Sequence, residues 1–133
     1  MTRYLLDTNI VSDLVRNPGG RITAKIAEIG EANVATSAIV AAELRYGAAK
    51  KNSVRLTAQL EAVLGVMEII PFEPPADAAY GEIRIALEAR GEIIGANDLL
   101  IAAQAAALEL TLVTDNMREF ARVPGLKTEN WLR

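Results

Sequence analysis

Four acidic residues stand at points where an α/β chain can bring carboxylates together. Asp7 and Asp115 end the apolar runs YLLD and TLVTD, Asp98 opens the apolar stretch NDLLIAAQA, and Glu43 lies within SAIVAAELRYG. The chain has no His and no Cys, which excludes imidazole and thiolate metal ligands, disulfides, a Cys nucleophile and a His general base. Closely packed carboxylates repel one another unless a cation neutralises them, and oxygen ligands suit Mg²⁺ or Mn²⁺. The residues therefore predict a divalent-metal site, whose natural reaction is hydrolysis of a phosphodiester.

Each acid also has a plainer interpretation. Asp7 and Asp115 could cap the helices that follow them, Glu43 could be an exposed helix residue, and Asp98 could favour the positive end of a helix dipole. Capping needs no companion acid, so it does not explain why all four fall near one predicted edge. We expect Asn97 to cap its helix and Asp98, in the first turn, to face the metal.

Apolar runs alternate with stretches of helical period, which predicts βα units around a mainly parallel sheet. The expected strands are 4–7, 34–36, 67–71, 111–114 and an edge strand within 126–131. The expected helices are 10–16, 22–29, one from Ser37 through Tyr46, 53–64, one from Pro75 to about Arg90, 97–108 and a short one at 119–121. Sites in such sheets form beyond the carboxyl ends of the strands, near the reversal of strand order. The acids are expected to meet there.

Four stretches, in this order and spacing, resemble the PIN-domain family, and most closely the VapC ribonuclease toxins of bacterial toxin–antitoxin pairs. They are DTNIVSDL, SAIVAAELRYG, GANDLLIAAQA and LVTDNMREFARVPGL, followed by the closing ENW. The resemblance covers residues 4–131 and implies a single PIN domain over residues 1–133. The implied fold is a three-layer α/β/α domain with a five-stranded, mainly parallel sheet.

The resemblance also assigns residues to the site. The family's acidic quartet, which is both catalytic and metal-binding, falls on Asp7, Glu43, Asp98 and Asp115. Polar positions that support the acids or the metal fall on Thr8, Asn9, Thr114 and Asn116. The implied activity is Mg²⁺- or Mn²⁺-dependent endonucleolytic cleavage of RNA.

The implied partners are a cognate VapB-like antitoxin that inhibits the enzyme and, only through that antitoxin, operator DNA. A homodimer is expected as well. The alternative is a non-catalytic module of PIN fold that acts as corepressor in a DNA-binding toxin–antitoxin complex. An intact quartet argues against that alternative, although one protein could serve in both ways.

Charge gives no global signal for nucleic acid, because 17 acidic and 14 basic side chains leave a net charge of −3. Arg45, Lys50, Lys51 and Arg55 form a local basic stretch that could contact an RNA backbone, or could simply be a solvated helix face and loop. The first residues do not resemble a signal peptide, and the longest uncharged stretch, 99–108, is shorter than the roughly 20 residues that span a bilayer. We expect a cytoplasmic protein without membrane contact, in which 99–108 is buried in the core or in a subunit interface.

Overall fold

The computed structural model describes residues 3–133, in which five strands form one sheet of order β3-β2-β1-β4-β5. All four strand pairings are parallel, so the expected α/β fold is confirmed and the sheet is parallel throughout these residues. The strands are β1 (Tyr4–Leu6), β2 (Val34–Ser37), β3 (Glu68–Ile70), β4 (Thr111–Val113) and β5 (Thr128–Glu129). Each lies within or beside the apolar run that predicted it.

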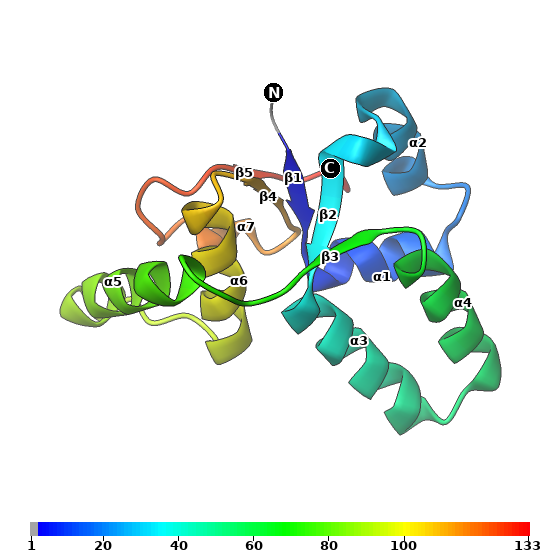
Figure 1. Ribbon diagram of the computed structural model, residues 1–133, viewed down its shortest axis with the longest axis horizontal. Helices are drawn as coiled ribbons and strands as arrows, with labels where there is room; N and C mark the ends of the chain where they lie inside the picture. Colours follow the sequence, from blue (N-terminus) through cyan, green and yellow to red (C-terminus); the bar gives the residue numbers. More distant parts are fainter. Residues whose placement is uncertain (1–2) are drawn as a thin grey trace.

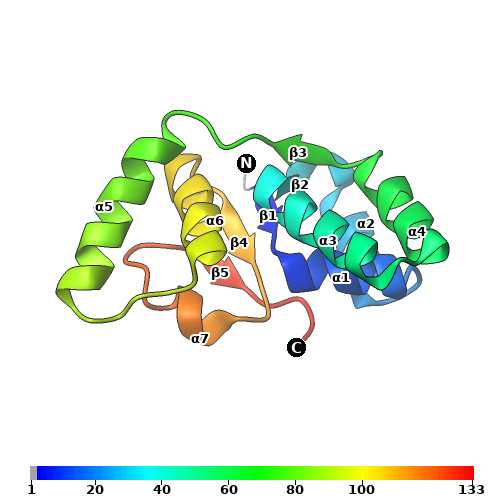
Figure 2. The same ribbon diagram turned by 90° about the horizontal axis from the view of Figure 1, so that it is seen from below.

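Helices flank the sheet on two sides, which gives three layers (Figure 1). The helices α1 to α4 gather on one side of the molecule, while α5, α6 and α7 lie on the other side (Figures 1 and 2). Their bounds are α1 (Thr8–Arg16), α2 (Arg21–Ile29), α3 (Ala38–Lys51), α4 (Val54–Leu64), α5 (Ala76–Ala89), α6 (Ala96–Ala107) and α7 (Met117–Phe120), with a 3₁₀ turn at Glu31–Asn33.

The order of the strands reverses beside β1. From β1 the chain builds outward through β2 to β3, and it then returns to the other side of β1 to form β4 and β5. The crevice between the carboxyl ends of β1 and β4 is therefore the switch point at which sites form in parallel sheets. Figure 2 views the molecule from this edge.

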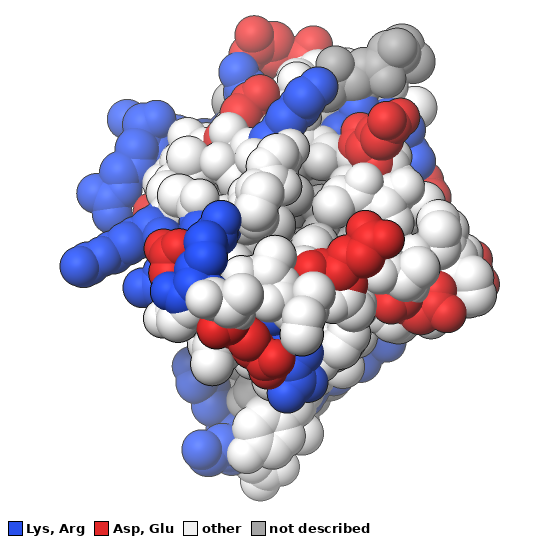
Figure 3. Space-filling view, turned by 90° about the vertical axis from the view of Figure 1, so that its left-hand side faces the viewer, with Lys and Arg blue, Asp and Glu red and all other residues white. Residues whose placement is uncertain are grey.

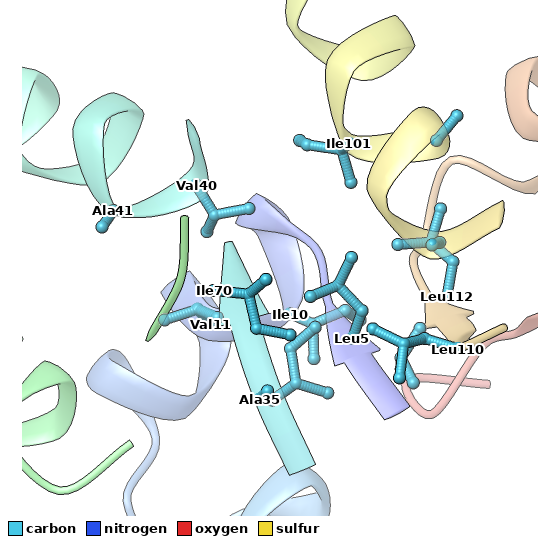
Figure 4. Packing of buried hydrophobic residues seen from close by; sticks show 14 of the residues in the cluster. Leu5, Ile10, Val11, Ala35, Val40, Ala41, Ile70, Ile101, Leu110 and Leu112 are labelled. Atoms are coloured by element: carbon cyan, nitrogen blue, oxygen red, sulfur yellow. The ribbon is translucent and has the colours of Figure 1, made fainter. Parts of the chain in front are cut away.

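The interior is filled by strand residues from the centre of the sheet and by the apolar helix α6. Leu5, Leu112 and Ile101 are fully buried, and Figure 4 shows them in one packed cluster with Ile10. Leu99 and residues 101–105 of α6 are buried within the chain, so this part of the 99–108 stretch belongs to the core, whereas Ala106 and Leu108 are exposed. Within residues 3–133 no helix has the length and apolar character needed to cross a membrane.

One boundary differs from the sequence prediction in a way that affects the site. Helix α3 does not end at Tyr46 but continues to Lys51, where Asn52 adopts a left-handed conformation with φ of 50°. Residues 47–51 continue the helix because the run GAAKK consists, after its glycine, of strong helix formers, with two lysines placed at the negative end of the helix dipole. Lys50 and Lys51 therefore belong to the helix that carries Glu43.

Candidate active site

Asp7 occupies the junction between β1 and α1. Its side chain is 3% exposed and caps α1, because Oδ1 accepts a hydrogen bond from the Thr8 N–H at 2.7 Å. The second oxygen, Oδ2, accepts from Thr114 Oγ1 at 2.7 Å, and Thr114 Oγ1 in turn accepts from the Asn116 N–H at 2.9 Å. The residues that follow β1 and β4 thus fix one carboxylate at the switch point.

Glu43 reaches the same edge from α3. Its Oε1 accepts a hydrogen bond from Thr8 Oγ1 at 2.8 Å, so Thr8 contacts both Asp7 and Glu43. The start of α3 is fixed by Ser37, whose Oγ accepts from the Ile39 N–H at 2.9 Å. A capped helix start therefore sets the direction from which Glu43 approaches.

Asp98 lies in the first turn of α6, next to a carboxylate that the sequence did not reveal. The Gly95 N–H donates to Glu119 Oε1 at 2.6 Å, and Asn116 Nδ2 donates to Glu119 Oε2 at 3.0 Å and to Asp98 Oδ2 at 3.4 Å. Asp98 and Glu119 also share a hydrogen bond. Glu119, from the short helix α7, therefore belongs to the acidic group at the switch point.

The prediction that Asn97 caps α6 is wrong. The helix begins at Ala96, and its N-cap is Gly95, which has no side chain to form a capping hydrogen bond. Asn97 lies inside the first turn. The Glu119 carboxylate takes over the role, since it accepts the Gly95 N–H and puts a negative charge at the positive end of the helix dipole.

The protonation of Asp98 reflects these neighbours. Burial, repulsion from Asp7 and the hydrogen bond with Glu119 raise its pKa from 3.8 to about 7, and the charges of Glu119 and Glu43 add to the shift. Below about pH 7, the protonated carboxyl of Asp98 can donate the hydrogen bond that it shares with Glu119. Burial also raises the pKa of Asp7, although hydrogen bonds from Thr114 and Thr8 oppose the shift.

Glu119 is the ionised partner of the Asp98–Glu119 pair. Burial acts to raise its pKa, but hydrogen bonds from Gly95, Asn116 and Asp98 outweigh burial and lower it. The sequence placed Glu119 in a short helix and did not single it out as a site residue. The one sequence signal for the role of Glu119 was Gly95, the N-cap of α6. A glycine there leaves the start of the helix without a capping side chain of its own.

Asp115 has a different environment. Its Oδ1 accepts hydrogen bonds from Asn130 Nδ2 at 2.8 Å and from Arg133 Nε at 3.2 Å, and these bonds lower its pKa. Its backbone N–H donates to Asn9 Oδ1 at 3.4 Å. The structure thus brings Asp7, Glu43 and Asp98 together with Glu119, and it places Asp115 on the C-terminal residues instead.

All four polar residues that were expected to support the acids contact one of them. Thr8 binds Asp7 and Glu43, and Thr114 binds Asp7. Asn116 binds Asp98, and Asn9 binds the backbone of Asp115. These hydrogen bonds come from α1 and from the loop after β4.

The donor set fits a hard divalent cation. Among residues 3–133 no three acidic side chains already converge as a formed metal site. However, the carboxylates supply only oxygen ligands, and within the described residues no Lys or Arg forms a salt bridge with Asp7, Glu43 or Asp98. Burial is the main cause of the raised pKa values of Asp7 and Asp98, and repulsion between carboxylates adds to it. A bound cation would favour the ionised form of both groups.

The basic residues that were expected to contact RNA have different surroundings. Arg45 is engaged by Glu61 through two hydrogen bonds of 2.9 Å, whereas Lys51 lines a surface hollow together with Glu43 and Arg16. On the face beside α5, Lys and Arg lie mainly toward one side and Asp and Glu are scattered among uncharged atoms (Figure 3). That face therefore does not form a uniform basic surface.

The chain is an α/β protein with acids gathered at the switch point of a parallel sheet, and comparison with known proteins identifies its family. The PIN domain model matches residues 4–126. Ribonuclease VapC2 of Rickettsia felis is 42% identical over 130 residues, which cover 96% of this chain and 97% of the relative. The tRNA(fMet)-specific endonuclease VapC of Salmonella typhimurium is 32% identical over 98% of this chain and 99% of the relative.

A solved structure agrees. A chain in the crystal structure of VapBC2 from Rickettsia felis, bound to a DNA fragment from their promoter, superposes with a TM-score of 0.90. It is 41% identical, and the match covers 98% of this chain and 99% of that chain. The protein therefore belongs to the PIN-domain family. Several of the relatives that it matches over nearly their full length are VapC ribonucleases.

Proposed function

We propose that this protein is a divalent-metal-dependent endoribonuclease, the toxin of a toxin–antitoxin pair, formed by a single PIN domain over residues 1–133. The observation that carries the proposal is the group of Asp7, Glu43 and Asp98 at the switch point, with charges that no cationic side chain of the described residues balances by a salt bridge. The relatives named ribonuclease and endonuclease support the reaction class.

Asp7, Glu43 and Asp98 would hold Mg²⁺ or Mn²⁺, and Glu119 completes the acidic group through its hydrogen bond with Asp98. When bound, the ion supplies neutralisation of the phosphate charge and makes water a stronger acid at neutral pH. Asp115 was expected in the same set. Its bonds to Asn130 and Arg133 support a second role, which is to fix the loop after β4 against the C-terminal residues.

The chain's own side chains keep this arrangement rigid. Thr8 and Thr114 hold the oxygens of Glu43 and Asp7, and Asn116 holds those of Asp98 and Glu119. Hydrolysis joins a water oxygen to phosphorus and breaks one phosphorus–oxygen ester bond, with one proton leaving the water and one reaching the departing oxygen. Misplacement of a reacting group by about 1 Å can cost about a hundredfold in rate, so these hydrogen bonds matter to the reaction.

RNA would reach the acids along the hollow that Glu43 shares with Lys51 and Arg16. Cations beside the acidic group attract the phosphate backbone and release its counterions. Lys50, in the same helical turn as Lys51, would add to this attraction, whereas Arg45 is engaged by Glu61. An RNA substrate would place the protein in the cytoplasm.

The proposed partner is a VapB-like antitoxin that inhibits the enzyme. Support comes from the VapBC2 structure, in which a similar chain is part of a complex bound to promoter DNA. The toxin would reach operator DNA only through its antitoxin, and we propose that it acts as a homodimer. Regulation of the operator would then be a second role of the same protein.

The test uses the purified chain, freed of antitoxin, with total cellular RNA and Mg²⁺ or Mn²⁺. Discrete products should form, and they should vanish with EDTA and in Asp98→Asn. Asp77→Asn is a matched control, because Asp77 occupies the first turn of α5 as Asp98 occupies the first turn of α6. Cleavage that persists in Asp98→Asn would refute the assignment of the site. A folded, metal-bound protein that cleaves no RNA would leave the corepressor role as the better account.

A further inference from the structure

Gln104 is a fully buried polar side chain in the apolar helix α6. Its Nε2 donates to the carbonyl oxygens of Ile70 at 3.1 Å and Pro71 at 3.2 Å, at the end of β3. Its Oε1 accepts a hydrogen bond from Ser37 Oγ. The side-chain amide therefore has a partner for each of its two N–H groups and for its oxygen.

These bonds join the helices that carry two of the acids. Ser37 ends β2 and caps α3, the helix of Glu43, while Gln104 lies in α6, the helix of Asp98. Asp98 and Gln104 are six residues apart, as are Ser37 and Glu43, so each acid lies about 9 Å along its helix axis from the linked residue. The Ser37–Gln104 bond is thus a rigid link across the interior from one acid-bearing helix to the other.

An apolar residue would satisfy the packing of α6 equally well. Burying an amide costs free energy unless all of its hydrogen bonds form, and a fully satisfied buried network fixes one arrangement of the elements that it joins. Leu99, Ile101 and Ala105, which are also buried in α6, allow small shifts of the helix because dispersion contacts have no fixed direction. The directional bonds of Gln104 oppose such shifts.

A purely structural role is the competing explanation. In that case Gln104 would serve only to satisfy the carbonyl groups at the end of β3, which is an edge strand of the sheet. The bond to Ser37 separates the two explanations, because Ser37 belongs to β2 and α3 and not to the end of β3.

We propose that Gln104 is a positioning residue, which sets the separation of Glu43 and Asp98 through its hydrogen bond with Ser37 and thereby sets the affinity for the divalent ion. This inference rests on the proposed metal-dependent function. It predicts that the link affects ion binding in the absence of RNA.

The first experiment compares Gln104→Met with the wild type. Methionine keeps the length of the side chain and removes all three hydrogen bonds. Mn²⁺ affinity, measured by electron paramagnetic resonance without RNA, should weaken by about tenfold, as is usual when a group that orients a metal ligand is removed. The kcat should fall by a similar factor while KM for RNA changes less than about threefold. Ile22→Val, a mild change at another buried position, should leave the Mn²⁺ affinity unchanged.

The second experiment isolates the link. Ser37→Ala removes the donor to Gln104 and also the cap of α3, so it is paired with Ser53→Ala, which removes the cap of α4. Ser37→Ala should weaken Mn²⁺ binding and Ser53→Ala should not. In the double variant with Gln104→Met, the effect of Ser37→Ala should largely disappear, because contacting residues in one network are not additive.

Four outcomes decide the matter. If Gln104→Met binds Mn²⁺ as tightly as Ile22→Val, the positioning role is wrong, whatever happens to stability. If Gln104→Met does not fold, Ser37→Ala decides alone, and unchanged Mn²⁺ affinity in it overturns the role. If the wild type binds Mn²⁺ but cleaves no RNA, the proposed reaction fails while the link remains measurable by Mn²⁺ affinity. A wild type that binds no Mn²⁺ overturns both proposals.

Discussion

Asp98 and Asp115 carry the same side chain near the same edge of the sheet, yet their surroundings are opposite. Asp98 lies among Asp7, Glu43 and Glu119, and its pKa is raised to about 7. Asp115 is held by Asn130 and Arg133, and its pKa is lowered. Asp115 has a cationic partner within the chain, Arg133. Asp98 has no such salt bridge among the described residues.

The difference separates two uses of an acidic residue. A surface carboxylate that is paired with arginine is already satisfied and contributes little to stability. When ionised, a half-buried carboxylate beside other carboxylates raises the free energy of the metal-free fold, and this cost is offset when the carboxylate takes up a proton or a cation binds. Sequence position alone does not distinguish the two cases, because both aspartates stand next to a helix start.

The largest expected effect is that of Asp98→Asn on RNA cleavage. The change keeps the size of the side chain and removes its charge, so kcat should fall by about 10²–10³-fold, as when one group that stabilises a transition state is lost. Steady-state cleavage of a defined RNA, with Asp77→Asn as the control, measures it. A loss of less than about threefold would show that the acidic group is not the catalytic one.

Glu119→Gln should have the next largest effect. Glutamine can still accept the Gly95 N–H, but it lacks the charge that faces Asp98, so kcat should fall by about 10–100-fold. The pKa of Asp98 should also fall toward its ordinary value, because both the charge and the carboxylate hydrogen bond of Glu119 raise it. Side-chain NMR titration in EDTA measures this pKa. If it stays near 7 in the variant, the pair does not share a proton.

Asp98→Asn should stabilise the metal-free protein at alkaline pH. The folded chain releases the Asp98 proton near pH 7 and the unfolded chain near pH 3.8, so the folded state of the wild type loses stability as pH rises through this interval. Above pH 7 the variant should gain on the order of 1 kcal/mol, a figure reduced for the partial exposure of the side chain. Urea unfolding in EDTA at pH 4 and pH 8 tests this, with little difference at pH 4. Equal stability at pH 8 would contradict the repulsion.

The smallest effect is expected for Asp115→Asn. Asparagine can still accept from Asn130 and Arg133, so kcat should stay within about threefold of the wild type and the unfolding temperature should hardly change. Parallel cleavage assays of Asp115→Asn and Asp98→Asn make the comparison direct. A loss as large as that of Asp98→Asn would mean that Asp115 leaves Arg133 and joins the other acids when the ion binds.

The sheet was predictable because buried parallel strands are short apolar runs, and the runs at 4–7, 34–36, 67–71 and 111–114 each contain a strand or most of one. Strand ends follow from the same runs, so Asp7 could be placed at the switch point. The end of α3 was predicted too early, because the helix continues past Gly47, a residue type that often ends helices, as far as Lys51.

The sequence predicted the edge of the sheet at which the acids gather better than it predicted which acids gather there. Asp98 and Glu119 are neighbours only because α7 folds against the start of α6, a contact between segments that local patterns do not describe. The same contact made the Asn97 prediction wrong, since a carboxylate from another helix serves the helix start. For Asp115, the decisive partners Asn130 and Arg133 lie 15 and 18 residues away in the sequence.

Gly95 lies beside two of the carboxylates of the site. Its φ of −57° is open to any residue, and a Cβ added there would lie 3.4 Å from Glu119 Oε1 and 3.6 Å from Asp98 Oδ2. Alanine therefore just fits, and its Cβ lies against both carboxylates. Substitution of Asp98 removes a proposed ligand in one step, whereas side chains of different size at position 95 would change the space beside Glu119 and Asp98 and leave every proposed ligand in place.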